Sequence, residues 1–400
     1  MQDNYFSLTR VRLGHFRSIA SADVELGPLL LLVGPNGAGK SNFLDALRLL
    51  SESLQGSLAQ ALRNRGGVTD VVHRSAGNPA AFSVELEFRA PGLHGAYGFE
   101  VTALLGGGYR VSREFCVVWY ADRPAAEGGR PSASFRVAHG EMTHTTEAVM
   151  PPVDDRRLTL VTAAGLDAFR PVYEGLAGIS VFHLNPDVMR RPQTPDSGDL
   201  LLRDGANVAS VLHRLQASAR GRRDQTRIEG YLRHIVPGMR GVSRTDVGGW
   251  ETLEFRQDAP DGEQPWKFPA QSVSDGTLRA LGVLVALFAG TGDTRSTIGI
   301  EEPENALHPA AAGVLLDALR DASERRQTIV TSHSPDLLDR HDFELSELRA
   351  VRSVDGETRI GPLDEAGALA LREHLYTPGE LLRNDQLLPA EPDSSVEAQQ

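Results

Sequence analysis

The chain has 400 residues, of which 40% are hydrophobic and 24% charged, a composition typical of a globular protein. Its formal net charge of −12 argues against a protein that coats nucleic acid by bulk electrostatic attraction, although local basic patches stay compatible with it. No stretch approaches the roughly 18 consecutive apolar residues that span a bilayer, and the N-terminus lacks the pattern of a secretory signal. The single cysteine, Cys116, excludes an internal disulfide, so we expect a cytoplasmic protein in which Cys116 is a small buried hydrophobe.

The first third of the chain is predicted to contain strands around one helix. Apolar residues recur at helical spacing over 42–54, directly after a glycine-rich stretch. A turn is expected at 90–98, between two strand patterns. The strand candidates, which carry alternating or continuous apolar residues, are 7–16, 22–26, 28–33, 81–88 and 113–120.

The remainder of the chain alternates between helical and strand patterns, after a stretch at 121–180 that is hard to assign. Such alternation predicts a mostly parallel sheet with helices covering its faces. The helix candidates are 206–216, 224–236, 275–290 and 310–326, and the strand candidates are 250–258, 296–300 and 327–333.

We divide the chain into four parts on this basis. Residues 1–120 and 251–385 are expected to form the two lobes of one α/β domain. Residues 121–250 are interpreted as a partly helical insertion between them. The polar residues 386–400 are expected to be a disordered tail.

A glycine-rich stretch, GPNGAGKS at 34–41, matches the phosphate-binding pattern G-x-x-x-x-G-K-[ST] between a predicted strand and a predicted helix. Its glycines allow backbone N–H groups to surround phosphate oxygens, and the following helix N-terminus adds positive potential. Lys40 would reach the β- and γ-phosphates, and the Ser41 hydroxyl would bind Mg2+. Because Lys40 and Lys267 are the only lysines among 41 basic residues, a chance match is rare.

Two adjacent carboxylates end the strand predicted at 296–300. Like charges at the end of a buried strand are unfavourable unless cations lie opposite them, and Mg2+ and Lys40 would supply that charge. We predict that Glu301 binds the water shell of Mg2+. Glu302 is predicted to be the general base that orients the attacking water. The alternative is an acidic strand end that points to solvent.

Two further features suit a nucleotide. His333 ends the next strand, where a histidine can hydrogen-bond the γ-phosphate and sense whether it is present. The alternative is a histidine without a role in nucleotide binding. The turn SVSDGT at 272–277 opens a helix, and a helix N-terminus is a second anion site. Both sites can serve one nucleotide in a two-fold dimer, in which each chain's turn covers the other chain's nucleotide. The alternative is an ordinary N-cap, with Ser274 or Asp275 capping the helix.

Together these motifs resemble the ABC-type ATPase heads of the RecF, structural-maintenance-of-chromosomes and overcoming-lysogenization-defect group, and the compact RecF-like predicted ATPases of the bacterial AAA family. The resemblance covers residues 8–90 and 266–340 well. It implies an ABC-head P-loop fold with an antiparallel β part and a largely helical insertion, and ATP and Mg2+ as cofactors. The nucleotide-binding positions that it implies are Gly34, Pro35, Asn36, Gly37, Ala38, Gly39, Lys40, Ser41, Asn42 and, near the base or phosphates, Arg17.

The resemblance also implies roles outside the phosphate loop. Ser274 and Gly276 take the signature positions that touch the partner's nucleotide, residues 305–308 take the dimer-facing loop, and His333 the switch position. The family often has a glutamine after the second strand as a metal and coupling ligand, but the nearest stretch here offers His73 and Arg74. The related nucleases carry a C-terminal metal-dependent domain, for which the 67 residues after His333 are too few, so we expect no nuclease activity.

An arginine cluster in the insertion is the best nucleic-acid candidate. Five arginines within fourteen residues could follow a phosphate backbone, with Arg190 and Arg191 beside them, although no aromatic residue is interleaved to stack bases. The alternative is a solvated helix face or interhelical loop. The five are Arg214, Arg220, Arg222, Arg223 and Arg227.

Two functions follow as competing hypotheses. The first is a slow ATPase that dimerises around two ATP molecules and acts as a conformational switch in DNA maintenance or antiviral defence, with a separate effector protein. The second is a module that uses ATP to hold a complex together while hardly turning it over. The motor of a membrane transporter is less compatible, because IEEPENALHP resembles the DNA-associated branch.

Overall fold

Strand β3 (Leu29–Val33) is buried on both faces, as its unbroken apolar sequence predicts. Leu30 and Leu32 pack into one hydrophobic core, whereas Leu29, Leu31 and Val33 pack into a second core on the opposite face. Successive side chains of a strand point to opposite faces, so a strand between two cores needs apolar residues throughout. The computed structural model describes residues 5–73, 80–121, 131–259, 264–290 and 297–391.

The central sheet contains β3 and has the strand order β16-β15-β3-β14-β13-β9. Its pairings are parallel in the part of the chain that the structure describes, except for the antiparallel edge pair β15–β16. This confirms the predicted mostly parallel sheet. The other strands are β9 (Ser180–Phe182), β13 (Ile298–Glu301), β14 (Thr328–Ser332), β15 (Leu348–Val354) and β16 (Glu357–Gly361).

A second, antiparallel sheet has seven strands in the order β2-β1-β4-β5-β6-β7-β8. The turn predicted at 90–98 is wrong beyond residue 92, because β5 starts at Leu93. Gly95 and Gly98 allow close strand packing, since a Cβ on Gly95 would lie 2.2 Å from the Val117 carbonyl oxygen. The strands are β1 (Ser7–Phe16), β2 (Ile19–Glu25), β4 (Ala81–Ala90), β5 (Leu93–Ala103), β6 (Tyr109–Tyr120), β7 (Ala133–Ala138) and β8 (Glu141–Thr145).

Helix α1 (Lys40–Gln55) lies between the two sheets, and its Phe43, Leu47 and Leu50 share one core with Leu30 and Leu32 of β3 and with the antiparallel sheet. Cys116 of β6 is fully buried in this core. The smaller helices on this side of the molecule are α2 (Leu58–Arg63), α3 (Val68–Val71), α4 (Thr159–Ala163) and α5 (Arg170–Ala177).

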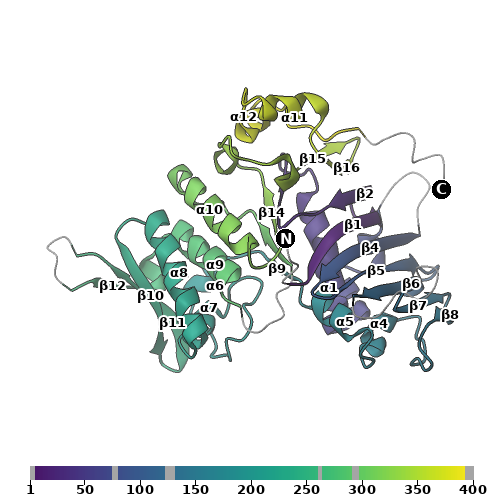
Figure 1. Cartoon of the computed structure of the whole chain (residues 1–400). Coiled ribbons are helices and arrows are strands. Elements are labelled where there is room, and N and C mark those ends of the chain that lie inside the picture. The colour runs from purple at the N-terminus through teal and green to yellow at the C-terminus, as the bar shows by residue number, and fades with distance from the viewer. Residues whose placement is uncertain (1–4, 74–79, 122–130, 260–263, 291–296, 392–400) are drawn as a thin grey trace.

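The opposite face of the central sheet is covered by helices, and a three-stranded sheet packs against the outer helices at the left of Figure 1. These elements are α6 (Pro186–Arg190), α7 (Val208–Leu215), α8 (Ala219–Ile235), α9 (Asp275–Phe288), α10 (Ala312–Ser323), β10 (Met239–Val247), β11 (Trp250–Gln257) and β12 (Trp266–Pro269). Helices α11 (Glu365–Arg372) and α12 (Pro378–Arg383) follow β16. Short 3-10 helices occur at Ala270–Ser272, Pro309–Ala311, Asp336–Leu338 and Leu345–Glu347.

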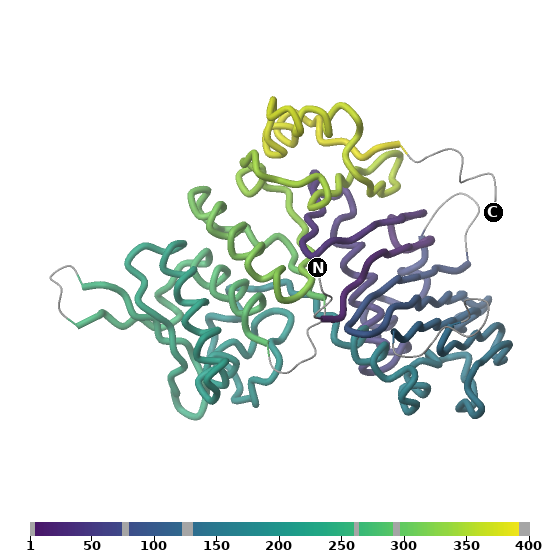
Figure 2. The backbone as a smooth tube through the Cα atoms, in the orientation of Figure 1, coloured from purple at the N-terminus to yellow at the C-terminus, as the bar shows by residue number. Residues whose placement is uncertain are grey.

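The predicted insertion, 121–250, is spread over all three sheets. Strands β7 and β8 extend the antiparallel sheet, β9 forms an edge of the central sheet, and β10 pairs with β11. Figure 2 shows the consequence, because the teal middle of the chain is divided between the two sides of the molecule. The domain boundaries at 121 and 250 stay a prediction, but strand pairing crosses both.

The disordered tail predicted at 386–400 is wrong for its first residues. Leu387 is 4% exposed, and Pro389 forms a β-bridge with Leu363. Residues 392–400 lie outside the described part of the chain. No helix among the described residues is long and apolar enough to cross a membrane.

Leu31→Ala should destabilise the protein by about 2–5 kcal/mol, because it leaves a cavity beside a fully buried strand. Urea unfolding followed by circular dichroism measures this free energy of unfolding. Leu105→Ala is the matched control, since Leu105 is fully exposed and its truncation should cost less than about 0.5 kcal/mol. Equal losses in the two variants would contradict the assigned core.

Candidate functional site

Three parallel strands bring the predicted site residues together at their carboxyl ends, on one side of the central sheet. Strand β3 ends before Gly34, β13 ends at Glu301 and β14 ends before His333. The Gly34 N–H donates to the Ser332 carbonyl at 3.3 Å, and the Glu302 N–H donates to the Thr331 carbonyl at 3.0 Å. The strand ends are therefore in direct register, and their loops face the same side.

The loop at 34–41 has the backbone geometry of an anion site. Gly37 and Gly39 have φ angles of 79° and 98°, which side chains other than glycine rarely adopt. A Cβ on Gly39 would lie 1.9 Å from the Thr358 hydroxyl oxygen, and one on Gly34 would lie 1.9 Å from the Val351 carbonyl oxygen. Helix α1 starts at Lys40 without a side-chain cap, so its first N–H groups can serve an anion.

Lys40 is 4% exposed, and its Nζ donates to the carbonyl oxygens of Gly34 at 2.8 Å and Pro35 at 2.9 Å. Burial lowers the pKa of Lys40, while the charges of Glu302 and Glu304 act in the opposite direction. The ammonium group is therefore held above the loop by groups that a phosphate oxygen can replace.

Side-chain hydrogen bonds fix the outer wall of this loop. Asn42 donates to the Ser18 hydroxyl at 2.6 Å, and Ser18 shares a hydrogen bond of 2.6 Å with Thr358. Thr358 in turn donates to the Ala38 carbonyl oxygen at 2.9 Å. Ser41 follows Lys40 in the first turn of α1 and is exposed. Asn36 is exposed as well.

Glu302 has a φ of 45°, a strained conformation for a non-glycine residue that often accompanies function. Its Oε2 accepts a hydrogen bond from Asn305 Nδ2 at 2.7 Å, and its Oε1 lies 3.1 Å from His333 Nδ1. His333 Nδ1 is buried and has no hydrogen-bond partner among the described residues. The structure thus brings the predicted base and the predicted switch histidine together.

Glu304 was not singled out from the sequence, yet it is 8% exposed behind this pair. Its Oε1 accepts from the Ser332 hydroxyl at 2.6 Å and from the His333 N–H at 3.2 Å. Burial raises the pKa of Glu304, and these hydrogen bonds oppose the rise. Glu304 therefore positions the backbone of His333.

The Glu301 carboxylate is approached on both oxygens by basic side chains that no sequence pattern indicated. Arg203 donates to Oε1 at 3.0 Å, and His183 Nδ1 lies 3.5 Å from Oε2. Burial alone would raise the pKa of Glu301, but the hydrogen bonds and charges of His183 and Arg203 outweigh it, and the pKa is lowered. Glu301 is thus held as an anion, the form that binds a metal.

The sequence could not identify His183, because the strand before it, β9, has only three residues. The stretch nearest to the expected coupling glutamine packs against the Arg17 turn. His73 Nδ1 is 2.6 Å from the Arg17 carbonyl oxygen, and its Nε2 is 3.7 Å from Glu357. Arg74 lies outside the described residues.

Arg17 has a φ of 52° and its Nε lies 2.8 Å from Asp45 of α1. Asp45 also pairs with Arg48 and Arg65, and its side chain is 11% exposed. Burial alone would raise the pKa of Asp45, but these arginines outweigh it and lower the pKa. The cluster fixes the Arg17 turn against the helix that follows the phosphate loop.

The turn that opens α9 contacts the loop after Glu302 within the same chain. Ser274 is the N-cap and accepts from the Thr277 N–H at 3.2 Å, as the capping alternative expects. A Cβ on Gly276 would lie 2.3 Å from the Ala306 carbonyl oxygen, so glycine is required there. Arg279 of α9 donates to the carbonyl oxygen of Glu302 at 3.1 Å and braces the acidic loop.

The same loop contains the residues expected to face a partner chain. Asn305 is bonded to Glu302, as described above. His308 Nδ1 accepts from the Ala310 N–H at 3.1 Å and so caps the short helix that precedes α10. Both residues stabilise the loop from within one chain.

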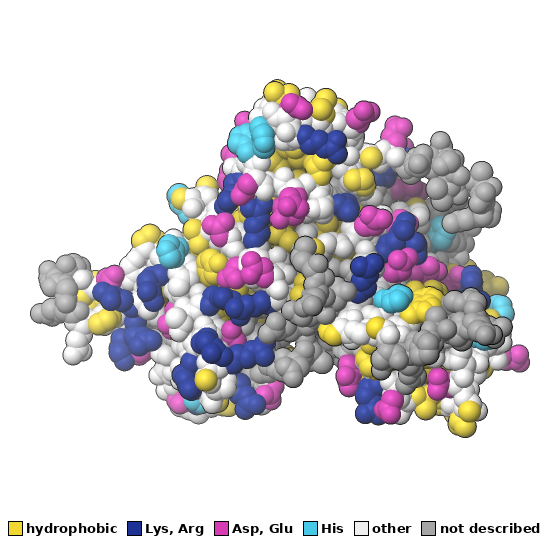
Figure 3. All heavy atoms as spheres, viewed as in Figure 1, with side chains coloured by type: hydrophobic (Ala, Val, Ile, Leu, Met, Phe, Trp, Pro, Cys, Tyr) yellow, Lys and Arg dark blue, Asp and Glu magenta, His cyan; other side chains and the backbone are white. Residues whose placement is uncertain are grey.

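The arginine cluster lies at the end of α7 and along α8, which begins at Ala219 and not at the predicted 224. Arg214 pairs with Asp199 at 3.0 Å, Arg227 with Asp321 at 3.4 Å, and Arg222 donates to a carbonyl oxygen. Part of the cluster is therefore neutralised by carboxylates. Figure 3 shows basic side chains gathered on this side of the molecule. Arg190 lies apart from them, because it pairs with Asp275 at the start of α9.

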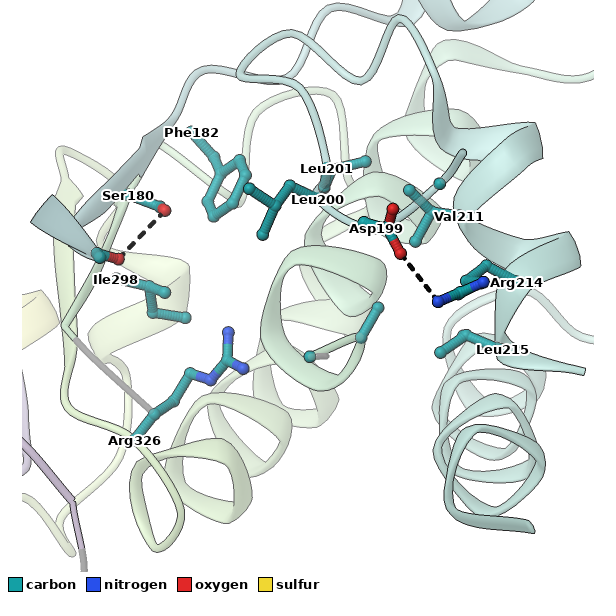
Figure 4. A pocket seen from close by; sticks show the side chains of 14 residues that line it. Ser180, Phe182, Asp199, Leu200, Leu201, Val211, Arg214, Leu215, Ile298 and Arg326 are labelled. Carbon is teal, nitrogen blue, oxygen red and sulfur yellow. Dashed lines mark hydrogen bonds and ion pairs between the residues drawn. The ribbon is translucent and has the colours of Figure 1, made fainter. Parts of the chain in front are cut away.

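A cavity of about 90 Å³ lies at the other end of the central sheet (Figure 4). Ser180 and Ile298, the first residues of β9 and β13, form one wall, and Arg214 and Asp199 form another. The cavity is therefore separate from the site, which is formed where these strands end.

The chain is in the class of P-loop ATPase domains of the ABC head type. This follows from the strand order of the central sheet, the glycine-rich loop after β3 and the acidic end of β13. Residues 29–113 and 179–339 match the family described as "AAA domain, putative AbiEii toxin, Type IV TA system". The chain belongs to this family. Its described site accordingly belongs to a nucleotide-binding domain.

Relatives and solved structures agree with this class. The OLD nuclease of Thermus scotoductus is 25% identical over 375 residues, which are 88% of this chain and 63% of that protein. The DNA replication and repair protein RecF of Magnetococcus marinus is 47% identical over 62 residues, 15% of this chain and 16% of RecF. The chain thus spans less than two thirds of these relatives.

Two solved structures share the fold. A SmcHead bound to the C-winged helix domain of ScpA has a TM-score of 0.54 at 13% identity, covering 91% of this chain and 99% of that one. An Smc head domain derived from Pyrococcus yayanosii has a TM-score of 0.51 at 11% identity, covering 92% and 100%. The expected resemblance to RecF and OLD is confirmed, and the chain shares its fold with SMC heads.

Asp45→Asn should lower the free energy of unfolding by about 3 kcal/mol at pH 7, because three arginines lose their shared anion. Since folding lowers the pKa of Asp45 below its ordinary value of 3.8, its contribution is complete above that value and is lost as the pH falls below it. Urea unfolding at pH 7, 5 and 3.5 should show the difference between wild type and variant narrow only at pH 3.5. Asp167→Asn, at a 92% exposed side chain, is the control, and a difference that is the same at every pH would contradict this account.

Proposed function

We propose that this chain binds ATP with Mg2+ at residues 34–42 and hydrolyses it slowly, using Glu302 as the general base. The convergence of Lys40, Glu302 and His333 at one sheet edge is the observation that carries the proposal. An isolated phosphate-binding loop would explain Lys40 alone. It would not explain why a strained glutamate and a histidine lie 3.1 Å apart beside it.

Each residue has a distinct role in this proposal. The N–H groups of the loop and Lys40 bind the phosphates, and Glu302 Oε1 accepts a proton from the attacking water. Asn305 fixes the rotamer of Glu302, and His333 lies where it can donate to the terminal phosphate. Arg17, held by Asp45, lies beside the base or the phosphates.

Ser41 and Glu301 fit a magnesium site, because a hydroxyl and an ionised carboxylate are the hard oxygen ligands that this metal takes. Bound Mg2+ would neutralise charge on the phosphates, while Lys40 and the loop orient them for an in-line attack.

A two-fold dimer would complete the site. Ser274 and Gly276 lie at the N-terminus of α9, and we propose that they cover the nucleotide held by a second copy of the chain. Arg279 and Gly276 tie this turn to the loop after Glu302, so a change at one nucleotide would reach the surface that binds the other. Residues 305–308 would lie at the dimer interface.

The biological role that we propose is a conformational switch in DNA maintenance or antiviral defence, acting with a separate effector protein. The OLD nuclease and RecF relatives support this setting by their names alone. A non-hydrolysing assembly module is the second candidate, and the pairing of Glu301 with Arg203 favours it, because that contact competes with metal binding.

Lys40→Ala should abolish ATP binding and turnover, since it removes the ammonium group from the phosphate loop. Glu302→Gln should retain binding, lower turnover by about 100-fold and accumulate an ATP-bound dimer. Steady-state phosphate release and sedimentation velocity with ATP measure both effects. Equal turnover by wild type and Glu302→Gln would exclude Glu302 as the base.

Lys267→Ala is the matched control for these variants, because Lys267 is the second lysine of the chain and is 65% exposed on β12. It should bind and hydrolyse ATP as wild type does. A loss of turnover in Lys267→Ala equal to that in Lys40→Ala would indicate a general effect of lysine removal and contradict the assignment.

Replacing Arg220, Arg222 and Arg223 with Gln should weaken binding to double-stranded DNA and reduce the slope of log affinity against log salt by about 3. Filter binding at several salt concentrations measures this slope.

The control replaces Arg156, Arg157 and Arg170, three exposed arginines on the other side of the molecule, and removes the same formal charge. Equal binding by the two triple variants would remove α8 as the DNA-binding surface.

A further inference from the structure

The two basic side chains beside Glu301, Arg203 and His183, come from one segment of the chain, residues 183–207, which starts where β9 ends. The two residues are joined through their backbones, because the His183 N–H donates to the Arg203 carbonyl oxygen at 3.0 Å. The neighbouring Asn185 N–H donates to the Asp204 carbonyl oxygen at 3.0 Å. The segment is thus a small, internally bonded unit placed against the end of β13.

The need for these cations follows from local charge. Glu301, Glu302 and Glu304 lie within four residues, and the Glu301 side chain is 13% exposed. Unpaired carboxylates at such burial are costly. Arg203 is 46% exposed, so its guanidinium reaches Glu301 from the solvent side and can leave without being buried elsewhere.

Arg203 is also opposed by a second cation. Burial lowers the pKa of Arg48 on α1, and the positive charge of Arg203 acts in the same direction. A further positive charge at Glu301 therefore meets repulsion from Arg203 as long as Arg203 stays in place.

We propose that Arg203 is an internal substitute for magnesium, which neutralises Glu301 in the free protein and is displaced when Mg2+ arrives with the nucleotide. This rests on the proposed function and extends it by naming a residue that sets metal dependence. Arg203 is a positioning residue, since it acts on the nucleotide only through Glu301.

Displacement of Arg203 would change the position of the Ser274 turn, which is proposed to cover the nucleotide of the second copy. Arg190 follows in the same segment, donates to the Val273 carbonyl oxygen at 3.2 Å and pairs with Asp275. The segment therefore touches Glu301 through His183 and Arg203, and it touches the start of α9 through Arg190, which lies between them in sequence. Metal binding and the position of Ser274 are linked through it.

The test measures the affinity of the full chain for a fluorescent ATP analogue by anisotropy, once in EDTA and once in Mg2+. The informative quantity is the ratio of the dissociation constant in EDTA to that in Mg2+. Arg203→Gln should raise this ratio about tenfold, because an uncompensated Glu301 repels ATP without metal and attracts Mg2+. Arg203→Lys keeps the charge and should retain the wild-type ratio.

A double-mutant cycle shows whether Arg203 acts through Glu301. Glu301→Gln should lower the ratio, and adding Arg203→Gln to it should change nothing further. Arg383→Gln is the control. It removes another exposed arginine, which pairs with Asp336 and Asp339 and not with Glu301, and its ratio should equal that of wild type.

The outcomes distinguish a failure of the Arg203 inference from a failure of the proposed ATP-binding function. If Arg203→Gln keeps the wild-type ratio while wild type binds and Lys40→Ala does not, Arg203 is no magnesium substitute and the proposed function stands. The inference also fails if Arg203→Gln changes the ratio equally with and without Glu301. If wild type and Lys40→Ala bind the nucleotide equally, the proposed function fails and this inference fails with it.

Discussion

Adjacent carboxylates at the end of a buried strand need cations around them, and this constraint organises the whole site. Lys40 approaches from the phosphate loop, Arg203 and His183 from the sheet edge, and Arg279 from α9. These basic side chains come from three parts of the chain, since His183 and Arg203 share one segment. The requirement for charge balance therefore connects the phosphate loop, the insertion and the helix that opens with Ser274.

The central sheet makes this convergence possible. Parallel strands place their carboxyl ends at one edge, and β3, β14 and β13 are consecutive neighbours there. The two cores that enclose β3 keep these strands in register, so the loops start from fixed points. Strain at Glu302 and the positive φ of Ala306 are tolerated because Arg279, Asn305 and Gly276 hold the loop from several sides.

The parts of this arrangement that the sequence predicts are those with local patterns. The phosphate loop, the acidic pair, β14 and the capped start of α9 are continuous segments with strong local preferences. His183 and Arg203 could not be predicted, because a three-residue strand has too little periodicity and their contact with Glu301 depends on tertiary pairing. The sequence predicts a turn over the first residues of β5, 93–98, for a related reason, since the glycines there serve close packing between strands.

The most direct test of the central claim is a crystal structure of Glu302→Gln with ATP and Mg2+. The account predicts the β- and γ-phosphates on Lys40, the metal beside Ser41 and Glu301, and Ser274 of a second copy over the same nucleotide. It also predicts that Arg203 has left Glu301. A nucleotide bound away from Lys40, or a Ser274 turn that faces only its own chain, would contradict it.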